Sequence, residues 1–399
     1  MKAAIAIIYL FVFSLAIQSA NASQALSLSH YSNTTAYPTN VSGASCAVYN
    51  SYIYCVGGFN NTLLTNNTYF AQITPFGIGN WTKSTPYPFN VTGHSCVASQ
   101  GYLYCIGGVA GETVSSRSID ASISSSGIGK WSNTTAYPTL TSMQSCNAYN
   151  GYVYCVGGAS PLGLTNSVYF ASLSAGGIGR WISTSQYPTD INSNSCVVNG
   201  NYLYCVAGTA GANFTTASYY ASLSQSGVSG WNRTTSYPTA TSGLTCFTIS
   251  GSIFCTGGGV GDAYTGNIVD TAATYVAPLD SSGIGDWNST SNYPYPASGI
   301  SCAVNGDKAY CIGGSLYNIN TNMSVIYRAI NPSVPQTTSP TTLQVQTPNV
   351  SSGSGPSPQP QQTQNTSGIS YLLILVIVVL IILMLLALYL FNRKPAQKA

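Results

Sequence analysis

A pair of cysteines that recurs at a fixed period is the feature that most constrains how this chain folds. The segment Ser45–Gly58 has the sequence SCAVYNSYIYCVGG, in which an apolar run joins two cysteines and a Gly-Gly pair follows. Five similar segments occur further along the chain. Their first cysteines lie 50 residues apart, except for a last interval of 56, at Cys46, Cys96, Cys146, Cys196, Cys246 and Cys302. A period of this length is typical of a repeat architecture, in which each unit is one supersecondary element.

Each cysteine pair is predicted to lie in a β-hairpin. If Cys46 lies opposite Cys55, then Asn50-Ser51 forms a two-residue turn, and Asn-Gly or related pairs hold this position in the other units. Such residues tolerate the positive φ angles of tight turns. The cysteines then occupy a non-hydrogen-bonded pair, whose Cα atoms lie about 4.5 Å apart and within reach of a disulfide. In an exported chain we therefore predict six disulfides, Cys46–Cys55, Cys96–Cys105, Cys146–Cys155, Cys196–Cys205, Cys246–Cys255 and Cys302–Cys311.

Metal coordination is the competing interpretation of these cysteines. Zinc sites favour short Cys-x2-Cys spacings and often include histidines. This chain has only His30 and His94. We therefore expect neither a metal ion nor a cofactor.

Two further strands are predicted in each unit. After Gly-Gly and a variable stretch comes a strand such as Thr68–Ile73, then a glycine turn such as Gly77–Gly79, and then a strand that carries a tryptophan. A Tyr-Pro pair follows each tryptophan six residues later, and because proline cannot donate to a sheet ladder it marks the end of that strand. Four short strands joined by tight turns are the unit of a propeller blade. The tryptophans are Trp81, Trp131, Trp181, Trp231 and Trp287.

Six hairpins but five tryptophans leave the last unit one strand short. Residues 30–38, HYSNTTAYP, are similar to residues 130–138, KWSNTTAYP. We therefore expect the N-terminal segment to complete the last unit, whose third strand is predicted near Ser324–Ile330. Closing the ring in this way removes the exposed sheet edges of an open array. The tryptophans and their partner tyrosines are expected to pack between blades.

These features resemble the kelch repeat. Gly-Gly ends the second strand, an aromatic residue such as Tyr69 lies in the third, and tryptophan lies in the fourth. The resemblance covers about Ala25–Asn331 and implies an all-β, six-bladed β-propeller of four-stranded blades closed by an N-terminal strand, similar to the central domain of galactose oxidase. The Ala207-Gly208 variant of Gly-Gly, the paired cysteines and the scarcity of charge depart from the pattern.

Both ends of the chain carry membrane signals. Residues 1–22 have the charged, apolar and small-residue layout of a secretory signal peptide, with an uncleaved anchor as the alternative. Residues 332–368, rich in Pro, Ser, Thr and Gln, are expected to form a stalk. Residues 369–391 are apolar for long enough to span a bilayer as a helix, and Arg393 and Lys394 place the short basic tail, residues 392–399, in the cytoplasm. We thus predict a single-pass type I cell-membrane protein whose propeller, residues 23–331, is extracellular.

The charge of the chain argues against nucleic-acid binding. Charged residues make up 5% of the sequence, with eleven basic and eight acidic residues. Four of the basic residues lie outside the repeats, at Lys2, Arg393, Lys394 and Lys398. The chain therefore has no basic patch that could neutralise the phosphate backbone of a nucleic acid.

The low content of acidic residues also bears on acid stability. A fold with few carboxylates loses little stability as they protonate, which suggests an acidophilic, archaeal host.

Candidate ligand-binding residues come from loops that differ among the units. The loops between second and third strands, at residues 59–65, 109–115, 159–165, 209–215, 259–271 and 315–321, should share one face, here named the variable face, with the connections between units. Function usually resides in loops on a rigid scaffold, although these loops can also differ simply because nothing constrains them. The candidates are Glu112, Arg117, Asp262, Asp270 and His94.

The predicted function is binding or adhesion at the cell surface, with an extracellular protein or glycan as partner. A carbohydrate-active enzyme, similar to sugar isomerases or mutarotases, and a structural protein of the cell envelope are the alternatives. No serine-hydrolase, phosphate-loop or zinc-protease motif occurs, so we assign no catalytic residue. Asn-x-Ser/Thr sequons make glycosylation possible at Asn33, Asn40, Asn60, Asn66, Asn90, Asn133, Asn213, Asn232, Asn288 and Asn322.

Overall fold

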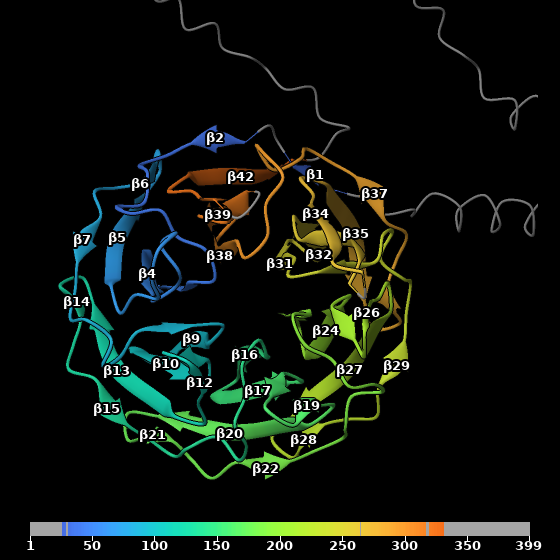
Figure 1. Ribbon diagram of the computed structural model, residues 1–399, viewed down its shortest axis with the longest axis horizontal. Helices are drawn as coiled ribbons and strands as arrows, with labels where there is room; N and C mark the ends of the chain where they lie inside the picture. The colour runs from blue at the N-terminus through green and yellow to red at the C-terminus, as the bar shows by residue number, and fades with distance from the viewer. Residues whose placement is uncertain (1–25, 29–30, 264, 317–318, 331–399) are drawn as a thin grey trace, which may run out of the picture. The chain divides into compact units, whose positions relative to one another are not determined.

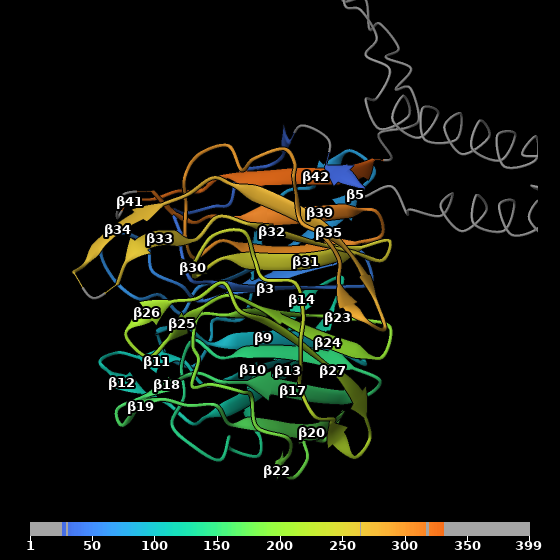
Figure 2. The same cartoon turned by 90° about the vertical axis from the view of Figure 1, so that its right-hand side faces the viewer.

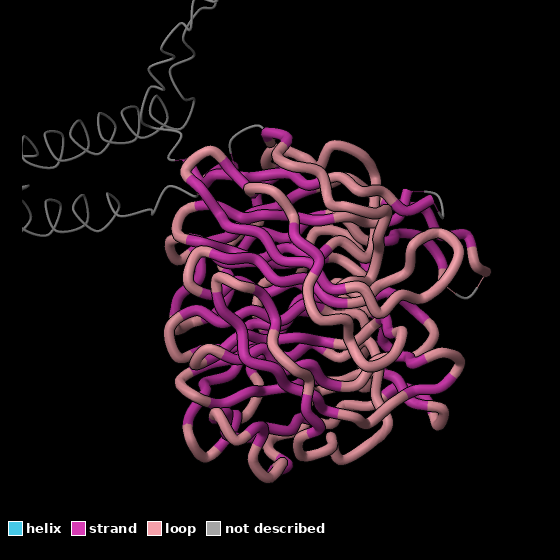
Figure 3. The backbone as a smooth tube through the Cα atoms, turned by 90° about the vertical axis from the view of Figure 1, so that its left-hand side faces the viewer, coloured by secondary structure: helices cyan, strands magenta, loops and turns pink. Residues whose placement is uncertain are grey.

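Six five-stranded antiparallel sheets are arranged around a common axis (Figure 1). The computed structural model describes residues 26–28, 31–263, 265–316 and 319–330, and every regular element in these ranges is a β-strand (Figure 3). The first strand of each unit lies next to the axis, where neighbouring first strands contact one another. These inner strands are β3 (Ser45–Tyr49), β9 (Ser95–Ser99), β16 (Ser145–Tyr149), β23 (Ser195–Asn199), β31 (Thr245–Ile249) and β38 (Ser301–Asn305).

Each sheet continues outward through a second strand of five residues and a third strand of seven. The second strands are β4 (Tyr52–Val56), β10 (Tyr102–Ile106), β17 (Tyr152–Val156), β24 (Tyr202–Val206), β32 (Ser252–Thr256) and β39 (Lys308–Ile312). The third strands are β5 (Thr68–Thr74), β13 (Ser118–Ser124), β20 (Val168–Ser174), β27 (Ser218–Ser224), β35 (Thr274–Asp280) and β42 (Ser324–Ile330). The last of these has the bounds predicted from the sequence.

The outer edge of each sheet is divided into two short strands, which is why the sheets have five strands instead of the four expected. The glycine turn forms the first, and the residues directly after tryptophan form the second. The pairs are β6 (Gly77–Ile78) with β7 (Thr82–Lys83), β14 (Gly127–Ile128) with β15 (Ser132–Asn133), β21 (Gly177–Ile178) with β22 (Ile182–Ser183), β28 (Gly227–Val228) with β29 (Asn232–Arg233), and β36 (Gly283–Ile284) with β37 (Asn288–Ser289).

The N-terminal segment supplies both outer strands of the last sheet. The strands β1 (Ser27–Leu28) and β2 (Ser32–Asn33) pair with β42, as Figure 1 shows. The prediction that the start of the chain completes the last unit is therefore confirmed. Because this sheet joins segments from both ends of the repeat region, the ring has no open edge between its first and last units.

The predicted hairpin register and all six disulfides are confirmed. Cys46 pairs with Cys55 across β3 and β4, and Asn50 and Ser51 form the turn with φ angles of 45° and 61°. The bonded cysteines have Cα atoms 4.0–4.1 Å apart, and no described cysteine is free. The bonds join Cys46–Cys55, Cys96–Cys105, Cys146–Cys155, Cys196–Cys205, Cys246–Cys255 and Cys302–Cys311.

Serine hydroxyls connect neighbouring inner strands. The backbone N–H of Cys96 donates to Oγ of Ser45, at 2.8 Å, across the boundary between two sheets. This contact explains why serine precedes most of the first cysteines: an inner strand pairs on one side only, and the hydroxyl satisfies a donor on its free edge. The same bond joins Cys146 to Ser95, Cys196 to Ser145, Cys246 to Ser195 and Cys46 to Ser301.

Tryptophan and tyrosine pack between sheets, as predicted. The ring of Trp131 meets that of the buried Tyr87 edge-on, with centroids 4.9 Å apart, and its indole N–H donates to the carbonyl of Thr85 at 3.0 Å. Equivalent tryptophan–tyrosine pairs lie at four of the other five boundaries. Aromatic pairs of this geometry contribute about 1 kcal/mol each beyond the area they bury.

The predicted signal peptide, stalk, membrane helix and tail lie outside the described residues. Within residues 26–28, 31–263, 265–316 and 319–330, no helix is long and apolar enough to cross a membrane.

Candidate ligand-binding site

The loops of the variable face form small hairpins of their own in five of the six units. They lie together on one side of the ring, at the left of Figure 2. The fifth unit has the longest, because its six extra residues lengthen both strands. These hairpins are β11 (Val109–Ala110) with β12 (Thr113–Val114), β18 (Ala159–Ser160) with β19 (Gly163–Leu164), β25 (Thr209–Ala210) with β26 (Asn213–Phe214), β33 (Gly259–Asp262) with β34 (Asn267–Asp270), and β40 (Ser315–Leu316) with β41 (Ile319–Asn320). Two further strands, β8 (Val91–Thr92) and β30 (Thr241–Ser242), extend the β11 and β33 hairpins.

A pocket of about 450 Å³, here named the axial pocket, lies at the axis on the variable face. Two rings of residues from the connections between units line it. The first ring, named the collar, is Gly43, Gly93, Met143, Ser193, Gly243 and Gly299. The next residue of each connection forms the second ring, named the inner ring, which is Ala44, His94, Gln144, Asn194, Leu244 and Ile300.

Backbone hydrogen bonds run from one collar residue to the next. The N–H of Met143 donates to the carbonyl of Gly93 at 2.7 Å, and that of Ser193 to Met143 at 2.9 Å. All six residues have positive φ, from 50° to 67°. Four are glycine, whereas Met143 and Ser193 adopt φ values of 58° and 50° that cost a side chain roughly 1–2 kcal/mol. Strain of this kind concentrates at functional sites, which directs attention to these two positions.

The inner ring is polar on one side and apolar on the other. His94, Gln144 and Asn194 come from three consecutive connections, and Leu244, Ile300 and Ala44 come from the other three. Apart from Ala44, all of these residues are buried. Since the ring positions are equivalent, this division arises from the sequence of each unit and not from a difference in backbone.

His94 is the most unusual member of the inner ring. Its side chain is 6% exposed, and neither ring nitrogen has a hydrogen-bond partner among the described residues. The ring stacks on Tyr87 at 5.9 Å. It also lies so close to Gly57 that a Cβ there would be 3.0 Å from Cε1. Burial lowers the pKa of His94 from 6.5 to about 4, so the imidazole is neutral at pH 7.

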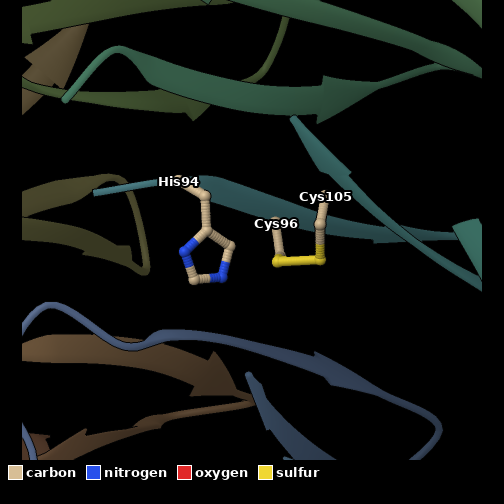
Figure 4. A group of neighbouring side chains, drawn as sticks. All are labelled: His94, Cys96 and Cys105. Carbon is tan, nitrogen blue, oxygen red and sulfur yellow. A yellow bond between two sulfur atoms is a disulfide. The ribbon is translucent and has the colours of Figure 1, made fainter. Parts of the chain in front are cut away.

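Figure 4 shows His94 beside the disulfide between Cys96 and Cys105, with potential ligand atoms of all three within 4.8 Å of one another. Cysteine binds metals as a thiolate. Here the two sulfur atoms are bonded to each other, so this cluster does not have the ligands of a zinc site.

The other polar members of the inner ring differ in how far their hydrogen bonds are satisfied. Nε2 of Gln144 donates to the carbonyl of Ile106 at 2.7 Å, and Oε1 accepts from Thr141 at 3.4 Å. Nδ2 of Asn194 contacts Sγ of Cys196 at 3.2 Å, but Oδ1 has no partner among the described residues. Buried polar atoms normally have partners, so His94 and Asn194 are exceptions, with donor and acceptor capacity that no described residue satisfies.

The rim of the axial pocket comes from the fourth and fifth units. Phe214 of β26 and Ile268 and Asp270 of β34 line the pocket together with the inner ring. Among the described residues that line the pocket, Asp270 is the only carboxylate and none is lysine or arginine.

Of the five predicted site residues, the structure brings His94 and Asp270 to one pocket and places the others elsewhere. Glu112 is exposed in the turn of the β11–β12 hairpin, and Asp262 is exposed at the far end of β33. The guanidinium of Arg117 lies 5.1 Å from the ring centre of Phe89, beside a separate cavity. Four lining residues were not predicted from the sequence, namely Gln144, Asn194, Met143 and Ser193. The first two occupy the position of His94 in their own units, and that alignment of the units was the available signal.

A second cavity, of about 460 Å³, continues along the axis between the inner strands. Mostly small side chains line it, together with Asn147, Phe247 and Ile300, and Nδ2 of Asn147 has no partner among the described residues. This cavity, named the channel, lacks the polar and apolar sides that distinguish the axial pocket.

Several sequons lie on the outermost strands of the ring. Asn33, Asn133, Asn232 and Asn288 are exposed on β2, β15, β29 and β37. By contrast, Asn66 is partly buried, and its amide donates to the carbonyl of Tyr87 at 3.1 Å. The remaining candidates are exposed at Asn40, Asn90, Asn213 and Asn322, and partly buried at Asn60.

Comparison with known proteins identifies the fold. The solved structure of YjhT is similar over 75% of this chain and the whole of its own length, with a TM-score of 0.64 and 14% sequence identity. The chain is an all-β protein with a β-propeller fold. At this identity the likeness shows the fold alone. No family model and no curated protein matches the sequence.

Proposed function

We propose that this protein is a cell-surface binding protein, a six-bladed kelch-like propeller held outside the cell by a C-terminal membrane helix, which recognises an extracellular glycan or protein through its variable face. The six disulfides support an oxidising, extracellular location. The stalk and the membrane helix rest on the sequence pattern.

One observation carries the binding role: the residues that line a pocket of ligand size include two whose buried polar atoms have no partner among the described residues. Leaving such an atom unsatisfied costs roughly 1–3 kcal/mol. Of the residues that line the axial pocket, His94 holds two of these atoms and Asn194 holds one. Together with the left-handed backbone at Met143 and Ser193, they are features that stability alone does not favour.

The test is a binding measurement on the full-length chain. Cells that display it, or purified chain in detergent, are applied to glycan and protein arrays. A double variant, Met143→Gly with Asn194→Leu, is compared with a triple variant, Glu112→Gln with Arg117→Gln and Asp262→Asn. Binding that the double variant loses and the triple variant keeps supports the axial pocket. If the triple variant alone loses binding, the site lies on the hairpins; if the unaltered chain binds nothing, the structural role in the cell envelope is favoured.

A sugar-processing enzyme is the second candidate, favoured by a histidine and an aspartate among the residues that line one pocket. Interconversion of sugar anomers needs an acid and a base, and His94 and Asp270 are residues of the right kind. Proton NMR of freshly dissolved sugars, with and without the protein, tests this. Acceleration that disappears in Asp270→Asn and in His94→Leu supports an enzyme, and unchanged rates exclude this activity for the sugars tested.

A further inference from the structure

We propose that the second unit contains a redox-controlled metal site. When the disulfide between Cys96 and Cys105 is reduced, the two thiolates and the imidazole of His94 bind one zinc ion or a similar thiophilic divalent cation. The inference does not depend on the proposed binding function. It rests on the placement of the three side chains, on the unpartnered imidazole and on the pairing of the strands that carry the cysteines.

The three metal-binding side chains lie on one side of the second sheet. Successive residues of a strand point to opposite sides, so His94, directly before β9, and Cys96, two residues later, project to the same side. Cys105 lies opposite Cys96 in the pairing of β9 with β10. Figure 4 shows the three side chains together, and their potential ligand atoms all lie within 4.8 Å of one another. Tetrahedral zinc, with bonds of about 2.0–2.3 Å, places its ligand atoms roughly 3.5–3.8 Å apart, so shifts of about 1 Å complete the site.

The imidazole of His94 has coordination capacity that the fold does not use. Its side chain is 6% exposed, and neither ring nitrogen has a hydrogen-bond partner among the described residues. Buried polar atoms without partners are uncommon, and a metal ion would satisfy one of these nitrogens. One imidazole and two thiolates are a ligand set that zinc takes in proteins, with water in the fourth position.

Comparison of the units shows that the position of His94 reaches the disulfide. In the fourth unit, Nδ2 of Asn194 contacts Sγ of Cys196 at 3.2 Å. The remaining units have alanine, glutamine, leucine or isoleucine at this position. None of these side chains, nor the amide of asparagine, is a usual zinc ligand. The sequence therefore confines the site to the second unit.

Backbone pairing holds the two cysteines opposite each other without the bond. The strand β10 pairs with β9 on one side and with β13 on the other, over five residue pairs each. Cys96 lines the channel and His94 lines the axial pocket, so the cluster lies between these two cavities. Reduction therefore opens the disulfide while the hydrogen bonds that set the spacing of the ligands remain.

The chemical step is thiol–disulfide exchange followed by coordination. Two molecules of a small thiol become one disulfide, and their two electrons and two protons convert the cystine to the thiols of Cys96 and Cys105. Zinc then binds both sulfur atoms as thiolates, which releases the two protons. Because zinc binds only the reduced form, it shifts the exchange equilibrium towards reduction.

The experiment is a redox titration of the full-length chain in detergent, in glutathione buffers with and without zinc at fixed free concentrations. Free thiols are alkylated at each step, and mass spectrometry of the peptides gives the reduced fraction of every disulfide. The equilibrium constant for reducing Cys96–Cys105 should increase with free zinc, by about tenfold at ten times the dissociation constant. The other five disulfides are internal controls and should not respond. Cobalt(II), used in place of zinc, should give the charge-transfer absorption of thiolate ligands.

Three variants connect the zinc effect to the imidazole. His94→Leu should abolish it, and leucine already occupies the equivalent position of the fifth unit at Leu244. Asn194→His should give the disulfide Cys196–Cys205 a zinc effect of its own, because the side chain at this position contacts Sγ of Cys196. His30→Gln changes the other histidine of the chain and is the matched control, which should leave the effect unchanged. Circular dichroism and the melting temperature confirm that each variant is folded.

The outcomes that overturn the inference are specific. They are an equal zinc effect on all six disulfides, no effect on Cys96–Cys105, or an effect that His94→Leu retains. A folded Asn194→His variant without a new zinc effect would also contradict the geometric argument. If tryptophan fluorescence shows that the chain unfolds when Cys96–Cys105 is reduced, no folded site exists and the inference is wrong.

Discussion

Replacing His94 with leucine should remove the main acid-sensitive element of this fold. The equivalent position of the fifth unit is already a leucine, Leu244, so the inner ring accommodates a leucine side chain. The pKa of His94 is lowered from 6.5 to about 4 because burial disfavours the charged imidazole. Between these two values the unfolded chain binds more protons at this site than the folded chain does, and so the free energy of unfolding decreases as the pH falls from about 6.5 to about 4.

The size of the effect follows from the shift. One pKa unit corresponds to 1.36 kcal/mol, so His94 should cost the folded state about 3 kcal/mol once the pH has fallen to about 4. Other shifted groups act differently. Burial raises the pKa of the Asp120 carboxyl, which opposes the loss, and a hydrogen bond from Ser282 lowers the pKa of Asp280, which acts below the ordinary carboxyl range.

The assay is urea unfolding of the full-length chain at pH 7, 6, 5 and 4, followed by tryptophan fluorescence with the disulfides intact. His30→Gln is included in both proteins, so that His94 is the one histidine that differs between them. The unfolding midpoint of the protein that keeps His94 should decrease across this range, while that of His94→Leu should change little. Parallel pH profiles for the two proteins would refute the assignment of acid sensitivity to the buried imidazole.

Three further predictions concern other parts of the ring. Met143→Gly should raise the free energy of unfolding by up to about 1 kcal/mol, because φ is 58° at this residue, and it should also weaken ligand binding. A loss of stability in this variant would show that the left-handed backbone is not strained. Ser45→Ala should lower the free energy of unfolding by about 1 kcal/mol, since the N–H of Cys96 loses its acceptor. The control Ser126→Ala, at an exposed residue, should have little effect. Equal effects of the two substitutions in urea unfolding would contradict this prediction. If the protein is expressed in a host that glycosylates sequons, mass spectrometry should find Asn133 occupied and Asn66 unoccupied, because the amide of Asn66 is engaged; the reverse pattern would be inconsistent with the exposure of these residues.

Much of each unit was predictable because it depends on residues that are close in the sequence. The two-residue turn at Asn50-Ser51 determines which residues of β3 and β4 lie opposite each other, and that register places Cys46 next to Cys55. Closure by the N-terminal segment was also predictable, since residues 30–38 are similar to the tryptophan segment of another unit. The division of the outer edge into two strands was not predictable. A glycine turn before a single outer strand and an interruption of the strand pairing have the same sequence signal.

The candidate site was harder to predict than the fold. Charged residues in the variable loops were a reasonable choice, yet the structure separates Glu112, Asp262 and Arg117 from the axial pocket. Distances between loops depend on how far each hairpin leans towards the axis, which no local pattern encodes. The polar side of the inner ring consists of residues that are ordinary in a strand-connecting segment. They become notable only because they line one pocket and because His94 and Asn194 have polar atoms without a partner among the described residues.

The amino-acid sequence alone determined the period, the hairpin register, the disulfides and the scarcity of charge, since these depend on composition or on contacts within about ten residues. Only the tertiary structure showed that positions one period apart meet at the axis. There His94, Gln144 and Asn194 form one side of a pocket that Leu244 and Ile300 complete. The physical reason is that packing between sheets, and not the chain within any sheet, sets the distance between equivalent residues of successive units.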